Sequence, residues 1–237
     1  MSHEPKGEPR GGAEVLLAIE TSQRQGGIAL RDRAGRAHVE RLVAMRRHDD
    51  DLLPAIDRLF ARLGLAPRDL GVVGVSVGPG GFTGLRIAVS TAKMLAEALG
   101  ARIVAVPSAL VAAEAYGGRG PIVVGLSAKN EKFWATRLER SGECWQIVGE
   151  PGLVDGAEFE PAGLDTVLAD QYLPAEARAR CERQGVGVLE PVFDPAACLA
   201  EAGRRWRAGD VTDPLQLTPL YPRPPEAVSI WERRKSS

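Results

Sequence analysis

Residues 72–100 read VVGVSVGPGGFTGLRIAVSTAKMLAEALG, which predicts a strand, a glycine loop and a helix. The valines up to Val77 are typical of a buried strand. An apolar stripe at helical spacing then runs to Leu99, and Gly100 is placed to cap the helix. The three glycines of residues 78–81 allow positive φ or a very close approach of another backbone.

The glycine loop leaves two readings open. It precedes a helix N-terminus, where free N–H groups and the positive end of the dipole attract anions, so it could receive an anion or a neighbouring backbone. It could equally be a tight strand-to-helix turn. No Lys-Ser or Lys-Thr follows the glycines, which excludes a Walker A loop, and the spacing is not a Rossmann fingerprint.

The string GPGGFTGLR, residues 78–86, closely resembles the GPGSFTGLR signature of the TsaB (YeaZ) family, with Gly81 where Ser is usual. That family is the accessory subunit of bacterial tRNA threonylcarbamoyladenosine synthesis. The resemblance implies an α/β, two-lobed actin-like (ASKHA, ribonuclease H-like) fold, with a duplicated mixed sheet and flanking helices. It also implies loop residues that contact an anion or nucleotide, namely Gly78, Gly80, Gly81, Phe82, Thr83, Gly84 and Arg86.

The first hairpin supports the same resemblance. Residues 15–19 predict a buried strand, and a polar, glycine-ended turn follows from Glu20 to Gly27. The opening Glu20-Thr21-Ser22 is similar to the IDTS opening of the family, with Glu20 where Asp is usual. In the actin-like superfamily this hairpin is the first phosphate loop, so these three residues join the candidate site.

Composition sets broad limits. The 237 residues suit one large domain or two lobes, and 44% hydrophobic with 26% charged residues is ordinary for a soluble globular protein. A net charge of −1 gives no global attraction to RNA or membranes. Three distant cysteines fit reduced thiols, and no apolar run approaches a membrane span, so we expect a cytoplasmic protein.

A helix is predicted from the aspartates 49–51 to Leu63, with Pro54 in its first turn and Leu53 on its apolar stripe. The segment resembles the family's H-x-x-x-L-L-P pattern. Catalytic relatives carry a His-x-x-x-His pair here, whereas Leu52 occupies the second position after His48. We therefore expect no metal site.

The chain divides best at the Gly-rich break of residues 117–121. We predict a disordered tail at 1–12, an N-terminal lobe at 13–116, a smaller C-terminal lobe at 117–228 and a basic tail at 229–237. A constant offset of 107 aligns residues 15–19 with 122–126 and Gly35 with Gly142, with the second hairpin one residue shorter. This weak repeat predicts two lobes built on one plan.

The second hairpin occupies the family's DAR-x-x-E-V-Y position but carries Ser127, Lys129 and Lys132 instead of Asp, Arg and Glu. ATP hydrolysis needs a carboxylate to hold Mg²⁺ or orient water. The second lobe is therefore poorly equipped for nucleotide hydrolysis. Farther on, strands at 166–169 and 186–189 and helices at 174–183 and 196–208 are predicted, and residues 217–223 resemble the family's PxYLR segment, with Pro222 replacing Leu.

The resemblance points to a non-catalytic scaffold that binds and activates the catalytic subunit TsaD, with the ATPase TsaE acting through the complex and tRNA bound at the level of the complex. It also implies a homodimer when the chain is alone, and no tightly bound cofactor, with weak ATP or ADP binding left open. The alternative is a stand-alone ATP-binding kinase-like or glycoprotease-like enzyme. The expected partner interface lies on the helices of both segments, at Leu52, Ile56, Phe60, Ile87, Thr91, Met94 and Ala98.

Overall fold

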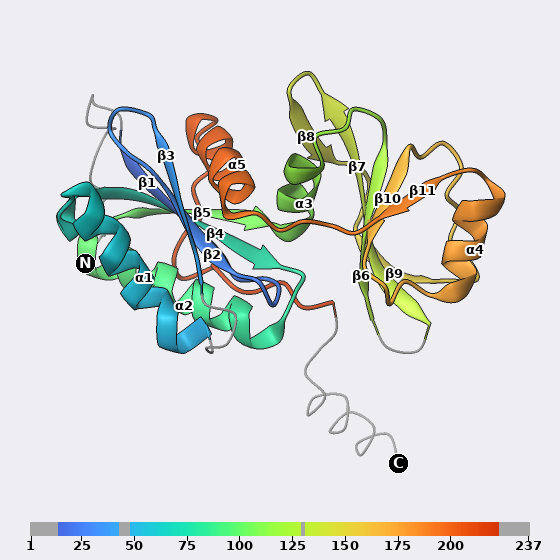
Figure 1. Ribbon diagram of the computed structural model, residues 1–237, viewed down its shortest axis with the longest axis horizontal. Helices are drawn as coiled ribbons and strands as arrows, with labels where there is room; N and C mark the ends of the chain where they lie inside the picture. The colour runs from blue at the N-terminus through green and yellow to red at the C-terminus, as the bar shows by residue number, and fades with distance from the viewer. Residues whose placement is uncertain (1–13, 43–47, 129–130, 223–237) are drawn as a thin grey trace, which may run out of the picture.

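The computed structural model describes residues 14–42, 48–128 and 131–222. The segments expected as tails, 1–12 and 229–237, lie outside these ranges, as do Lys129 and the side chains of residues 48–50 and of Ser127. Figure 1 shows two sheets side by side, each with helices against its faces. The predicted two-lobed α/β architecture is confirmed.

The first sheet has the strand order β3-β2-β1-β4-β5. β1 pairs antiparallel with β2 and parallel with β4, and β4 pairs parallel with β5. The helices that follow these strands are α1, α2 and α3. The bounds are β1 (Val15–Glu20), β2 (Gly27–Arg31), β3 (Ala37–Arg41), α1 (His48–Leu63), β4 (Leu70–Gly78), α2 (Phe82–Leu99), β5 (Arg102–Pro107) and α3 (Ser108–Tyr116).

Alternating side chains of this sheet build two separate cores. Leu17 and Ile19 face α1 and α2 in one apolar cluster. Leu16 and Ala18 face the opposite side, where they pack against a helix from the far end of the chain, α5 (Pro195–Arg207). The first sheet is therefore the middle layer of three, which fixes where the ends of β1 and β4 emerge.

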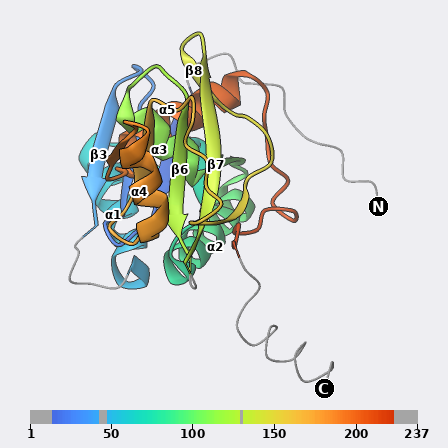
Figure 2. The same ribbon diagram turned by 90° about the vertical axis from the view of Figure 1, so that its right-hand side faces the viewer.

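The second sheet has the order β11-β10-β6-β7-β8, with β9 paired to β7. Figure 2 shows this lobe in front, with α4 nearest the viewer. The predicted strand at 166–169 and helix near 174–183 are confirmed. The bounds are β6 (Ile122–Ser127), β7 (Lys132–Ser141), β8 (Cys144–Ile147), β9 (Gly152–Asp155), β10 (Thr166–Ala169), α4 (Ala175–Arg183) and β11 (Gly187–Leu189).

The two lobes repeat one pattern. β6 pairs antiparallel with β7 and parallel with β10, as β1 does with β2 and β4. Glu20 is opposite Gly27 in the first hairpin and Ser127 is opposite Phe133 in the second, so the second loop is one residue shorter. Gly35 and Gly142 both have positive φ in the next turn. The predicted repeat is confirmed.

Part of the segment expected as the C-terminal lobe, 117–228, packs on the first sheet instead of the second. α3 follows β5 and α5 follows β11, so the two helices hold equivalent places in the repeat. α3 packs its Ala109 and Leu110 into the core of the second sheet, whereas α5 returns to the first. The residues after α5 follow it: Thr212 N donates to Ile103 O at 2.8 Å, and Leu217 joins the first core.

Two details of α1 differ from expectation. The helix begins at His48, so Pro54 lies in its second turn rather than its first. Its buried stripe contains Leu52, while Leu53 is 45% exposed. Ile56, Leu59 and Phe60 of the expected stripe are buried, so the stripe differs from the expected one only at its first member. α2 behaves as predicted, with Gly100 in the left-handed conformation at its end.

Candidate functional site

Two loops meet at the carboxyl ends of β1 and β4, which are adjacent parallel strands. The first is the turn that begins with Glu20-Thr21-Ser22, and the second is residues 78–81. Gly81 N donates to Ser22 O at 2.7 Å, and Thr21 Oγ1 donates to the Gly84 carbonyl at 2.8 Å. Parallel pairing therefore brings together the two loops that the sequence singled out separately.

The glycines serve the contact between these loops. A side chain at Gly80 would run into Ser22 O, and Gly78 has φ +104 with a cis bond to Pro79. The Gly81 N–H is bound to Ser22, and the Ser22 N–H is bound to Glu20. Two of the amide donors that an anion would need are thus engaged, so the loop is built for backbone contact.

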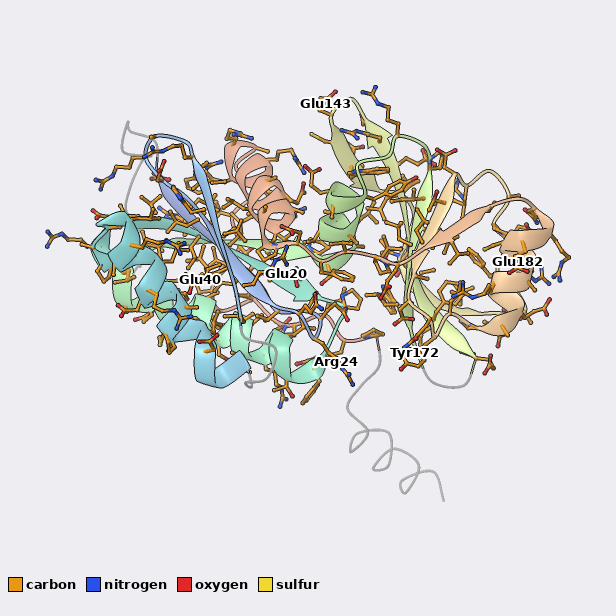
Figure 3. The ribbon with its side chains drawn as sticks, in the orientation of Figure 1. Glu20, Arg24, Glu40, Glu143, Tyr172 and Glu182 are labelled. Atoms are coloured by element: carbon orange, nitrogen blue, oxygen red, sulfur yellow. The ribbon has the colours of Figure 1, made fainter. Side chains whose placement is uncertain are left out.

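Glu20 is fully buried at the end of β1 (Figure 3). Its Oε1 accepts from Ser22 N at 2.7 Å, while Oε2 is buried without a hydrogen-bond partner. Burial raises the pKa of this carboxyl, and hydrogen bonding to Ser22 opposes the rise only in part. The side chain therefore acts as a support for the loop.

Behind Glu20 lies a buried polar group that the sequence did not indicate. Ser76 and Ser108 hydroxyl oxygens are 2.9 Å apart, and Cys198 of α5 reaches the Ile19 carbonyl at 3.9 Å. Burial, together with the charges of Glu20 and Glu201, raises the pKa of the Cys198 thiol well above its usual range. Cys198 is therefore an inert thiol inside the fold.

The first turn of α2 carries the exposed part of the motif. Phe82 is 45% exposed, and the Arg86 guanidinium carbon lies 4.1 Å from the centre of its ring. Thr83 is exposed beside them. The ring of Tyr221 lies 5.1 Å from that of Phe82, and Leu220 N donates to Val77 O at 2.7 Å. In the sequence, this last contact is indicated only by the resemblance of residues 217–223 to the family's PxYLR segment.

The seven residues expected at a partner interface separate into two groups. Leu52, Ile56, Phe60 and Thr91 are buried inside the lobe. Ile87 is partly buried against the same core, and Met94 and Ala98 are exposed. On α1 the exposed leucine is Leu53 rather than Leu52. Of the residues considered for an interface, Leu53, Met94 and Ala98 are therefore exposed and Ile87 is partly exposed.

A cleft of about 600 Å³ separates the lobes. Arg24 of the first loop and Tyr172 of the second lobe face it, as Figure 3 shows. None of the described glycine-loop residues lines it, and neither does Glu20. The lining is Gln23, Arg24, Gln25, Arg41, Leu126, Asp170, Gln171, Tyr172, Glu190, Pro191, Val192 and Phe193.

The described part of the chain shows neither a metal-binding cluster nor a membrane-spanning helix. No three of its His, Cys, Asp or Glu side chains are grouped to hold a metal ion. None of its helices combines the length and apolar character of a membrane span.

Two lobes built on a repeated mixed sheet, with a cleft between them, define an actin-like fold. A model of the family described as "TsaD: tRNA N6-adenosine threonylcarbamoyltransferase" matches residues 14–167. The chain belongs to this family, and its resemblance to TsaB (YeaZ) proteins is confirmed by the relatives it matches.

TsaB of Bacillus subtilis, a tRNA threonylcarbamoyladenosine biosynthesis protein, is 39% identical over 95 residues, 40% of this chain and 41% of that protein. An uncharacterized protein of Mycobacterium leprae is 31% identical over 199 residues, 82% of this chain and 47% of that protein. The chain thus spans less than half the length of these relatives. YeaZ from Pseudomonas aeruginosa has the same fold, with TM-score 0.75, 22% identity and coverage of 88% and 99%.

Proposed function

We propose that this chain is a non-catalytic subunit of tRNA threonylcarbamoyladenosine synthesis that binds and activates the catalytic protein TsaD. TsaE would act through the same complex, and tRNA would be bound at the level of the complex. The observation that carries the proposal is the exposed apolar surface of α1 and α2, next to a motif that resembles the TsaB family's signature. Alone, the same surface would pair two copies of the chain.

The apolar surface supports docking because large apolar side chains on it are exposed. Leu53 and Met94 are each 45% exposed, on helices that contact each other along the same face of the first sheet. Large apolar side chains gathered on neighbouring helices favour a helix-to-helix interface. The partly buried Ile87 connects this surface to the core, so it contributes to the fold as well.

The state of Glu20 supports a non-catalytic role. A carboxylate that holds Mg²⁺ or orients water must reach the substrate. Glu20 is buried, its Oε1 is bound to the loop backbone, and it does not line the cleft. The equivalent position in the second lobe is Ser127, which has no carboxylate at all.

The test is light scattering on a sizing column, with the chain alone and mixed with TsaD from the same organism. A one-to-one complex is expected. The variants Leu53→Asp and Met94→Asp should each weaken it about tenfold or more, because a carboxylate buried in an apolar interface is costly. Leu189→Asp, on an exposed apolar residue of the second lobe, is the matched control and should bind normally.

Absence of a complex with the unaltered chain would overturn the scaffold role. Equal weakening by Leu189→Asp would show that the interface is not confined to α1 and α2. Ile87 is a poor choice for this test, since an aspartate there would also disturb the core.

A second candidate rests on the cleft between the lobes. Its cationic Arg24 and Arg41 and its exposed Tyr172 could hold an ATP or ADP molecule weakly, as a kinase-like enzyme would. Isothermal titration with ADP, followed by an ATP turnover assay with Mg²⁺, separates the candidates. Turnover that Arg24→Ala abolishes would favour the stand-alone enzyme, whereas binding without turnover would leave the scaffold role intact.

A further inference from the structure

The segment 217–221 crosses from the far edge of the first sheet to the glycine loop. It comes after α5, yet the hydrogen bond of Leu220 and the ring contact of Tyr221 are both with the first lobe. Leu217 is buried in the core beneath α2, and Leu220 N donates to Val77 O at 2.7 Å, beside the last residue of β4. In Figure 1 this segment runs below the first sheet, alongside α2.

The glycine loop is held from two sides. On one side, Ser22 O accepts from Gly81 N. On the other, a side chain at Gly78 would meet Leu220 O at 2.7 Å, so the segment lies directly against the turn. The loop therefore lies between Ser22 and Leu220.

The ring of Tyr221 extends this contact to α2. It packs against Phe82, the first residue of the helix, with the ring centres 5.1 Å apart and the planes at 35°. Arg86 covers Phe82 4.1 Å from the ring centre. Tyr221, Phe82 and Arg86 therefore form a stack that sets the direction of the first turn of α2.

We infer that Leu220 and Tyr221 are positioning residues: they hold the glycine loop and the first turn of α2 in the orientation that the partner recognises. This inference rests on the proposed function, because it concerns the helix that is proposed to dock. It adds that a segment after the second lobe controls a docking helix of the first.

Two measurements on Tyr221→Ala test the inference. The first is hydrogen–deuterium exchange at residues 81–86, which does not require a partner. The second is affinity for TsaD. We expect faster exchange at these amides, unchanged exchange in β6 and β10, and binding about three- to tenfold weaker, as the loss of one aromatic contact predicts.

Tyr221→Phe keeps the ring and removes a hydroxyl that is buried without a hydrogen-bond partner, so it should restore both readouts. Leu215→Ala is the matched control in the same part of the chain, since its side chain is 88% exposed. Met94→Asp should weaken binding about tenfold or more without changing exchange at residues 81–86.

The outcomes are distinct. If the unaltered chain does not bind TsaD, the proposed function fails, and unchanged exchange in Tyr221→Ala would overturn the positioning role separately. Weaker binding with unchanged exchange would mean that Tyr221 contacts the partner itself, which also overturns positioning. Faster exchange with normal binding would show that the orientation of this turn does not matter to the partner.

Discussion

Glu20 shows how one side chain can keep its place in a motif while changing its role. Its carboxyl lies at the end of β1, where the family usually has Asp, but it is fully buried. One oxygen holds the Ser22 amide and the other has no partner. The longer side chain has therefore become part of the loop's internal support.

The raised pKa of Glu20 predicts a pH-dependent stability. The folded chain holds this proton more tightly than the unfolded chain, so the contribution of Glu20 to stability is greatest at low pH and is lost as pH rises from about 4.5 through the raised folded pKa. Glu20→Gln keeps an oxygen that accepts from Ser22 N. It removes the ionisable group, so this loss of stability with rising pH should not occur in the variant. Its melting temperature should exceed that of the unaltered chain at neutral pH, by about 2–4 °C for each kcal/mol gained.

Thermal unfolding from pH 4 to 8 checks this, with Glu143→Gln as the control because its carboxylate is 89% exposed. A melting temperature of Glu20→Gln that follows the unaltered chain at every pH would contradict the assignment.

At the scale of elements, the junction of β4 and α2 depends more on Gly80 than on Gly81. Gly80 lies against Ser22 O, whereas a side chain at Gly81 would have 3.6 Å to the same atom. Gly81 is the N-cap of α2 with extended backbone angles and no side-chain cap. The family's usual Ser would fit there.

Gly80→Ala should therefore destabilise the fold by about 1–3 kcal/mol, because the added methyl forces the two loops apart. Gly81→Ser should be neutral or stabilise by a few tenths of a kcal/mol, roughly the gain of an N-cap side chain over glycine. Urea unfolding monitored by tryptophan fluorescence measures both. Equal effects of the two variants would show that the loops are not in close contact.

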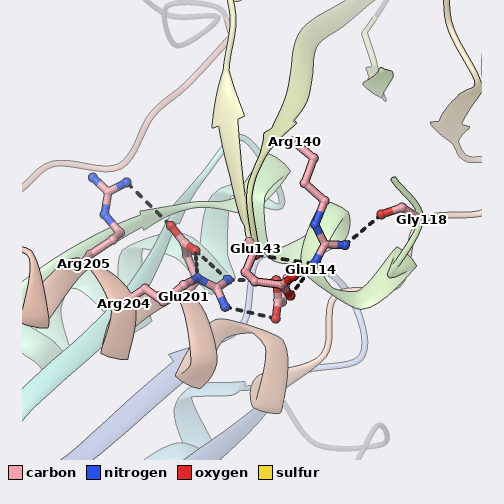
Figure 4. A network of polar contacts seen from close by, with 7 residues as sticks. All are labelled: Glu114, Gly118, Arg140, Glu143, Glu201, Arg204 and Arg205. Atoms are coloured by element: carbon pink, nitrogen blue, oxygen red, sulfur yellow. Dashed lines mark hydrogen bonds and ion pairs between the residues drawn. The ribbon is translucent and has the colours of Figure 1, made fainter. Parts of the chain in front are cut away.

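At the scale of the whole molecule, α3 and α5 tie the lobes together. Figure 4 shows the polar network between them. Arg204 of α5 donates to both oxygens of Glu114 of α3, at 3.1 and 2.8 Å, and to Glu201 at 2.7 Å. Arg140 of the second sheet donates to the carbonyl of Gly118, just after α3. Since each helix packs on the other lobe's sheet, this network couples the two cores.

Arg204→Met should cost about 1–3 kcal/mol, because it leaves the buried Glu201 without its closest cation. Arg183→Met removes an ion pair whose side chains are 59% and 51% exposed, and should cost less than about 1 kcal/mol. Urea unfolding compares the two directly. Similar small losses in both would mean that the network between α3 and α5 does not couple the lobes.

Local patterns were sufficient for much of the fold. The strand, loop and helix of residues 72–100 were predictable from valines, glycines and helical spacing, and the repeat from a constant offset. The first turn of the stripe of α1 was not: Leu52 and Leu53 are both apolar and lie about 100° apart around the helix, and Leu52 is the one that is buried. Only packing against the sheet selects between them.

The sequence by itself determined the order of the elements, the two-lobed plan and the loop motif, because each depends on residues close together in the chain. The tertiary structure alone decided that Gly80 meets Ser22, that α5 returns to the first sheet and that Tyr221 packs on Phe82. These are contacts between distant segments. Their partners are selected by which faces remain unburied once the sheets have formed, and no local pattern records that choice.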